Sequence, residues 1–158
     1  MGYRRKQLGS SAGGEKLGCS LYEVPPGRRA WPYHYHLANE EAIYVLEGSG
    51  TLRIGREEIG VSKGDYVALP ARAQAAHQLV NDSGVVLRCL CYSTMIEPDV
   101  MVYPDSGRWA SLAGLRPEDR RRREPSASSS ERRPRSATTR AKNSGALAIR
   151  IPVSEGYK

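Results

Sequence analysis

Histidine and cysteine are scarce in this chain, and long apolar runs are absent from it. The 158 residues include three histidines and three cysteines. No apolar stretch approaches the roughly 20 residues that a membrane-spanning helix needs, so we expect no membrane span. The basic segment Met1–Lys6 is not followed by an apolar stretch, and we therefore expect no secretory signal peptide.

The cysteines do not indicate a disulfide framework. Their number is odd, and Cys89 and Cys91 lie two apart in an apolar run, on one face of an expected strand. Because disulfides are rare in the cytosol, we interpret the cysteines as reduced, partly buried thiols of a cytoplasmic protein. Packing is the role that we expect for them.

The excess of positive charge belongs to the C-terminal part of the chain. Residues 115–158 contain twelve Lys and Arg residues and five acids, which accounts for the whole net charge of +7. This segment is rich in Arg and Ser and has almost no large apolar residues before Leu147, so it cannot bury enough surface to offset its ordering entropy. We expect residues 115–158 to be disordered, with a short strand over 147–152 as the alternative.

A basic tail can bind nucleic acid by releasing counterions from phosphates. Aromatic residues that would stack on bases do not interleave with the arginines of this tail. We therefore expect a solvated extension rather than a nucleic-acid interface.

Residues 17–103 consist of short strand-like segments separated by Gly and Pro turns. The expected strands are 17–24, 41–47, 51–54, 59–61, 66–70, 77–80, 85–93 and 99–103. Their close and regular spacing, without a helical period, predicts an all-β sandwich or barrel. We divide the chain into an N-terminal segment (1–16), a β-barrel (17–114) and the basic tail (115–158).

The expected strand 41–47 is apolar on both faces. Ile43 and Val45 share one face, and Tyr44 and Leu46 share the other. A small barrel has one interior, so the outer face needs a cover, either the N-terminal segment or a second subunit. We expect a homodimer.

All three histidines take part in a pattern that is typical of a metal site. His34 and His36 are two apart on extended chain, so their side chains point the same way, and Glu41 follows five residues later. Imidazole nitrogens and a carboxylate are suitable ligands for a divalent transition metal. We predict a mononuclear site of His34, His36, Glu41 and His77. Fe, Mn, Ni and Zn all fit this ligand set.

Several neighbouring residues are alternatives or possible contributors to this site. Glu40 is the rival ligand beside Glu41, but strand parity favours Glu41 because Ile43 and Val45 follow on its side. The tyrosines that flank the histidines, Tyr33 and Tyr35, alternate to the opposite face, and we expect them to pack. Other candidates are Arg53, expected as a solvated arginine that could bind a phosphate or carboxylate, Arg72, a candidate substrate gate, and Asn81, expected as a turn residue.

Two motifs, in the right order, make residues 17–103 resemble the cupin superfamily. The first cupin motif is a Gly, a short run, His-x-His, three or four residues, Glu, six residues and Gly. This chain matches it with Gly27, His34, His36, Glu41 and Gly48. The one departure is an extra residue between Gly27 and His34.

The second cupin motif is Gly, five residues, Pro-x-Gly, two residues, His, three residues and Asn. This chain matches it with Gly64, Pro70, His77 and Asn81. Arg72 stands in place of the second Gly, and two extra residues precede His77. The position of His77 relative to the other three predicted ligands therefore depends on how the chain accommodates these two residues.

The chain is similar to small single-domain bacterial cupins, in which a segment like Val102–Gly107 follows the last strand. Some of these cupins are labelled sugar-phosphate isomerases. The resemblance implies a cupin-type double-stranded β-helix, that is, a small jelly-roll barrel. It also implies a metal site that binds or acts on a small polar molecule, such as a sugar phosphate or a carboxylate.

The type of activity is left open by these residues. A metal-dependent isomerase or epimerase needs a general base beside the metal, and every histidine is already used as a ligand. Glu47 or Tyr92 would have to serve. The alternatives are a non-haem metal-dependent dioxygenase and a non-catalytic sensor of small ligands. No catalytic residue is assigned.

Overall fold

The computed structural model describes residues 1–113 and 150–152, and this part of the chain contains strands and short 3-10 turns but no α-helix. The predicted all-β fold is therefore confirmed. In chain order the elements are β1 (Arg4–Gln7), η1 (Ser10–Ala12), β2 (Gly18–Val24), β3 (Tyr35–His36), β4 (Glu41–Glu47), β5 (Ser49–Ile54), β6 (Glu57–Ser62), β7 (Asp65–Leu69), η2 (Ala73–Ala75), β8 (His77–Val80), β9 (Leu87–Ser93), β10 (Asp99–Tyr103), β11 (Arg108–Leu112) and β12 (Arg150–Pro152).

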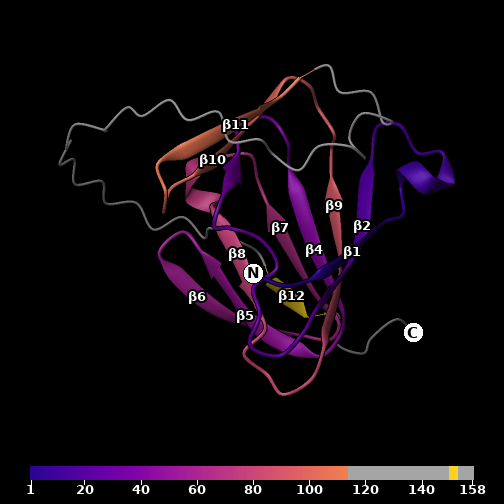
Figure 1. Cartoon of the computed structure of the whole chain (residues 1–158), viewed down its shortest axis with the longest axis vertical. Helices are drawn as coiled ribbons and strands as arrows, with labels where there is room; N and C mark the ends of the chain where they lie inside the picture. Colours follow the sequence, from indigo (N-terminus) through magenta and orange to yellow (C-terminus); the bar gives the residue numbers. More distant parts are fainter. Residues whose placement is uncertain (114–149, 153–158) are drawn as a thin grey trace.

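The strands form one large sheet and two small ones, as Figure 1 shows. The six-stranded sheet has the order β1-β2-β9-β4-β7-β12, and the three-stranded sheets have the orders β11-β10-β3 and β6-β5-β8. Every pairing between these strands is antiparallel. This arrangement of strands from distant parts of the chain is that of a small jelly-roll barrel.

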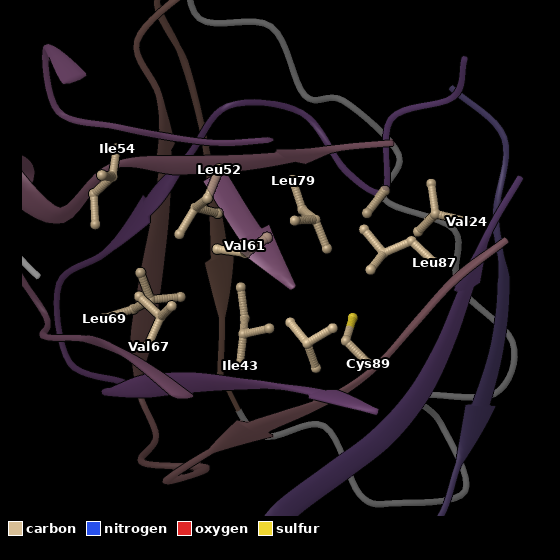
Figure 2. Packing of buried hydrophobic residues seen from close by; sticks show 12 residues of the cluster. Val24, Ile43, Leu52, Ile54, Val61, Val67, Leu69, Leu79, Leu87 and Cys89 are labelled. Atoms are coloured by element: carbon tan, nitrogen blue, oxygen red, sulfur yellow. The ribbon is translucent and has the colours of Figure 1, made fainter. Parts of the chain in front are cut away.

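The core lies between the large sheet and the β6-β5-β8 sheet. Figure 2 shows Ile43 and Val67 of the large sheet facing Leu52 and Leu79 of the small one. All four side chains are at most 2% exposed, because alternate residues of each strand point inward. Burying an aliphatic side chain of this size contributes about 1.5–3 kcal/mol, so this layer holds the two sheets together.

A tight turn at Gly48 joins β4 to β5. Gly48 has a φ of +80°, and a Cβ atom there would lie 2.6 Å from the carbonyl oxygen of Val86. Any other residue would be strained by its backbone conformation and would also collide with the main chain. The Gly that ends the first motif therefore has a steric role at this turn.

The sheet extends beyond the strands that the sequence predicted. The N-terminal segment contributes β1, which pairs with β2, and β11 follows β10 after the turn at 104–107. Near the C-terminus, Arg150–Pro152 forms β12 and pairs with β7, in agreement with the alternative of a short strand there. Residues 114–149 and 153–158, which hold the rest of the predicted disordered tail, lie outside the described part of the chain.

The outer face of the large sheet carries apolar side chains, as the pattern of strand 41–47 indicated. Leu46 is 36% exposed and Tyr66 is 38% exposed. Strand β1 adds to the edge of this sheet next to β2, and β12 adds to the opposite edge, so neither strand covers the face. The homodimer that would cover it stays a prediction.

Among residues 1–113 and 150–152, the structure contains no helix with the length and hydropathy of a membrane span.

Candidate metal centre

Backbone pairing brings two of the histidines together. The backbone N–H of His34 donates to the carbonyl of His77 at 3.1 Å, and the N–H of His77 donates back at 2.8 Å. Residues that exchange bonds in this way have side chains on the same face. The two imidazole ring centroids are accordingly 4.7 Å apart.

The two extra residues of the second motif do not displace His77. The short turn η2, at Ala73–Ala75, takes up the chain between Arg72 and His77, and His77 then begins β8. Ala75 and Ala76 are both 1% exposed, so the turn is anchored in the core. The insertion thus leaves His77 in register with His34.

The three imidazoles converge on one carboxylate oxygen. Oε2 of Glu41, the first residue of β4, lies 3.8 Å from Nε2 of His34, 3.3 Å from Nε2 of His36 and 3.4 Å from Nε2 of His77. The histidine side chains are at most 10% exposed, whereas that of Glu41 is 22% exposed. The centre is therefore buried on the histidine side and open to solvent beside Glu41.

Each imidazole is oriented by a hydrogen bond at its other nitrogen. Nδ1 of His34 lies 2.9 Å from the Pro32 carbonyl, and Nδ1 of His77 lies 3.1 Å from the Ala75 carbonyl. A carbonyl oxygen can only accept, so both Nδ1 atoms donate and both Nε2 atoms are left to face Glu41. Histidine ligands of metals are commonly held in this way.

The third imidazole is held by Asp99, a residue that the sequence reasoning placed only at the start of the last strand. Nδ1 of His36 lies 2.5 Å from Oδ2 of Asp99. Asp99 is 1% exposed and also accepts from the Ala38 backbone N–H at 2.9 Å and from Asn39 Nδ2 at 2.7 Å. Burial raises the pKa of Asp99, but these hydrogen bonds outweigh burial and hold the pKa below its usual value.

The charges at the centre differ from residue to residue. Burial lowers the pKa of His34 to about 4, helped by the charge of His77. At His36 burial also lowers the pKa, but Glu41 and Asp99 outweigh it and raise the pKa to about 9. At Glu41 burial raises the pKa, and hydrogen bonds from His36 and His77 hold it well below its usual range. The carboxylate at the middle of the cluster is thus ionised at neutral pH.

Aromatic side chains surround the histidines. The indole of Trp31 stands edge-on to His34 and His77, with ring centroids 6.4 Å and 6.0 Å away. The ring of Tyr103 stacks on His34 at 5.9 Å. This apolar wall lowers the local dielectric and so strengthens any charge interaction at the centre.

The neighbouring candidates occupy different places. Glu40 is exposed, so the parity argument for Glu41 agrees with the structure. Tyr33 is buried and its hydroxyl donates to the Gly55 carbonyl at 2.7 Å, which is a packing role. Arg53 is not free in solvent, because its guanidinium carbon lies 3.7 Å from the centroid of the Tyr33 ring.

Arg53 also forms a double hydrogen bond, at 2.7 Å and 2.9 Å, with the carboxylate of Asp105. Arg72 is exposed before η2. Asn81 is fully buried, and its side chain spans the turn by donating to the carbonyls of Val24 and Val85 at 2.7 Å each. These contacts agree with the expected turn role of Asn81.

The two residues considered as general bases do not lie beside the histidines. Glu47 ends β4, six residues from Glu41, and is paired with Arg88 at 2.7 Å. Tyr92 lies next to Cys91 on β9, and strand alternation places it on the outer face of the sheet. Neither Glu47 nor Tyr92 is therefore placed to act as a general base beside the metal.

The three cysteines are free thiols, in agreement with the sequence interpretation. Cys89 is buried in the core, and its sulfur lies 3.9 Å from that of Cys91. The pair therefore lines the interior of the barrel rather than its surface.

The donor set fits a transition-metal ion. The donor atoms of His34, His36 and Glu41 all lie within 4.8 Å of one another, and Nε2 of His77 is 3.4 Å from the Glu41 oxygen. Two ligands that are each about 2.1 Å from one ion lie about 3.0–3.4 Å apart. Three imidazoles and one carboxylate would leave one or two positions of a five- or six-coordinate ion open for a ligand.

Comparison with known proteins agrees with this fold. The cupin domain family model matches residues 20–93. An uncharacterised protein of Methanocaldococcus jannaschii is 36% identical over 70 residues, which are 44% of this chain and 54% of that protein. This chain thus spans about half the length of that curated relative.

Two solved structures are similar over more of the chain. A proposed sugar phosphate isomerase from Acidithiobacillus ferrooxidans is 34% identical, with a TM-score of 0.67 and 70% of each chain covered. A sugar phosphate isomerase of the cupin superfamily from Silicibacter pomeroyi is 26% identical, with a TM-score of 0.64 over 74% of this chain and 82% of that one. The strands, the two histidine motifs and these likenesses agree, and the chain belongs to the cupin superfamily.

Proposed function

We propose that this chain binds one divalent transition metal through His34, His36, Glu41 and His77, and that the metal binds or acts on a small polar molecule. The observation that carries the proposal is the convergence of three Nε2 atoms on one Glu41 oxygen, at 3.3–3.8 Å. Buried histidines that only pack need a partner for the N–H donor and a partner for the acceptor nitrogen of each ring. Three that face one carboxylate, each with the opposite nitrogen anchored, match a set of metal ligands.

The residues around the centre orient the imidazoles and control the access of water and ligand. Asp99 and the carbonyls of Pro32 and Ala75 fix the directions of the three imidazoles. Trp31 and Tyr103 restrict water on the histidine side, and the partly exposed Glu41 marks the side from which a ligand enters. A bound metal would supply a Lewis acid that polarises a carbonyl or hydroxyl oxygen of that ligand.

The choice between an isomerase and a binding module depends on a proton acceptor. Burial raises the pKa of Tyr22, Cys91 and Tyr103, so these groups near the centre stay protonated at neutral pH. An isomerase at this site would therefore depend on Glu41 or on a group of the substrate as its base. Sugar-phosphate isomerisation is the activity that we test first, because the two similar structures carry that name.

The experiment is made on metal-loaded protein purified from its native host. Sugar phosphates are followed by NMR for isomerisation or epimerisation, and oxygen uptake is followed in parallel with small hydroxy acids. Isomer formation that disappears on chelation supports the isomerase, and oxygen uptake by iron-loaded protein identifies the dioxygenase. Saturable ligand binding without turnover identifies the sensor. Protein that holds no metal in any preparation contradicts the proposal as a whole.

Two further features of the protein belong to this proposal. The apolar residues on the outer face of the large sheet, among them Leu46 and Tyr66, support a homodimer that buries them. The three free cysteines support a reducing, cytoplasmic environment.

A further inference from the structure

Strand β1 places an arginine on the interior face of the large sheet. Arg5 is paired in register with Tyr22 of β2, and Tyr22 is paired with Cys89 of β9. Figure 1 shows β1 beside β2. Residues that are directly opposite in neighbouring strands point to the same face. Cys89 belongs to the core, so Arg5 shares the inward face, although it lies on the edge strand and remains exposed to solvent.

The side chain of Arg5 leans toward the metal centre. Its Nε donates to Oγ of Ser20 at 3.1 Å, and Ser20 lies two residues before Tyr22 on β2. The next inward position in the same direction is Gly18, which is paired with Ser93, and Ser93 is paired with Glu41. The Arg5 side chain therefore extends by one row along the sheet, toward the row that contains Glu41.

Tyr22 and Cys91 lie on the inward face beside Arg5 and pack against the core. The guanidinium carbon of Arg5 lies 5.6 Å from the centroid of the Tyr22 ring. Cys91 is paired with Ser20, which accepts from Arg5, and with Ile43, which lies two residues after Glu41 on β4. Tyr22 and Cys91 are both half-buried. The strand register thus places Ser20 and Cys91 between the arginine and β4, the strand that carries Glu41.

The guanidinium of Arg5 differs from two other arginines of the barrel in its partners. Arg53 is neutralised by Asp105, and Arg88 is neutralised by Glu23 and Glu47. Within residues 1–113 and 150–152, no carboxylate forms an ion pair with Arg5. Because Nε is used by Ser20, the two Nη groups are the donors that can form a fork with an anion.

We propose that Arg5 binds the anionic group of a small ligand whose other end reaches the His34–His36–Glu41 centre. The backbones of Ser20 and Glu41 are two strands and one row apart, or roughly 12 Å at ordinary strand dimensions. A Cβ atom on Gly18, in the row of Glu41, would lie 2.6 Å from Sδ of Met95, so a compact molecule that spans this distance must displace the flexible end of the Met95 side chain. The ligand class is a small hydroxy or hydroxycarbonyl compound with a terminal phosphate or carboxylate. This inference rests on the proposed function of the centre.

The test uses the metal-loaded full chain and defined probes. Fructose 6-phosphate, gluconate and uncharged fructose are titrated by calorimetry, and the metal content of each sample is measured. The wild type should bind at least one of the two anionic probes at least tenfold more tightly than fructose, and the two probes distinguish a phosphate from a carboxylate source. In Arg5→Gln this preference should fall about tenfold or more, with the metal content unchanged. Arg5→Lys keeps the positive charge but not the two-pronged hydrogen bonding of a guanidinium, and it should retain part of the preference for the anionic probe.

Arg4→Gln is the matched control, because Arg4 is the preceding residue of the same strand and points to the opposite face. It should behave as the wild type. If Arg5→Gln keeps the full preference for the anion, or if the wild type binds both anionic probes no better than fructose, the assignment of Arg5 is wrong. Loss of metal from the wild-type protein would instead contradict the proposed function, and the metal measurement separates the two failures.

Discussion

The Nδ1 atom of His36 lies 2.5 Å from Oδ2 of Asp99, and 63 residues separate the two in the sequence. Strand β10 brings them together, because Met101 and Val102 pair with His36 and Tyr35 of β3. A charge-assisted hydrogen bond of this kind fixes the imidazole plane and makes Nε2 a better donor to a metal. Asp99 is therefore a positioning residue of the proposed centre.

Asp99→Asn should weaken metal binding while the fold is retained. Asn keeps the shape and one acceptor oxygen but loses the charge, and loss of such a partner typically costs 10–100-fold in metal affinity. Competition with a chelator of known affinity measures the change. Asp105→Asn is the control, since Asp105 is exposed and paired with Arg53, and it should leave the affinity unchanged. Equal metal affinities for the two variants would show that Asp99 does not position His36 for metal binding.

Glu41→Gln should lose most of the bound metal, and Glu40→Gln should retain it. The two residues are adjacent, but Oε2 of Glu41 lies 3.3 Å from Nε2 of His36 whereas Glu40 is exposed. An amide removes the negative charge that the ion requires and keeps the volume of the side chain. Elemental analysis of the two purified variants makes the comparison directly. Retention of metal by Glu41→Gln would show that the carboxylate is not a ligand.

Much of the centre could be predicted from the sequence because its pattern is local. Two residues separated by one position on extended chain must share a face, which placed His34 beside His36, and parity within strand 41–47 favoured Glu41 over Glu40. The position of His77 depended on a longer segment. The turn η2 takes up its two extra residues, and the sequence alone did not show whether they would shift the register.

The remaining features depend on contacts between distant segments. A single aspartate at the start of a strand has the same local pattern as a turn residue, so the burial of Asp99 against His36 follows only from the β3–β10 pairing. Strand β1 has the sequence RRKQ, which shows no alternation of apolar and polar residues. β1 pairs with β2 because the edge of β2 presents unpaired backbone N–H and C=O groups, and this pairing places Arg5 on the inward face. The composition of β1 does not predict it.

Gly48→Ala should destabilise the barrel by at least about 1 kcal/mol. The residue has a φ of +80°, and a methyl group there would lie 2.6 Å from a backbone oxygen that cannot easily move. Gly60→Ala is the control, because a Cβ atom at Gly60 meets nothing within 4 Å. Thermal or urea unfolding compares the two variants. Equal stabilities would contradict the steric role of this turn.

The wild-type protein should sediment as a dimer at micromolar concentration. Leu46→Glu should shift it toward the monomer, because a charge on the outer face of the large sheet would be buried at the interface without a partner. Val85→Glu is the control at an exposed apolar residue in the turn before β9, and it should sediment as the wild type. A strictly monomeric wild type would rule out the dimer without affecting the metal site.

The number of metal ions per chain in the wild type and in His77→Ala tests directly whether the three histidines and Glu41 form one metal site. His77 is the ligand that follows the two-residue insertion, and its Nε2 lies 3.4 Å from the Glu41 oxygen. Arg72→Ala, in the same connection but exposed, serves as the control. We predict one transition-metal ion per wild-type and Arg72→Ala chain and a loss of stoichiometric metal in His77→Ala. An unchanged metal content in folded His77→Ala, or a wild-type protein that takes up no metal, would show that these four residues are not a metal site.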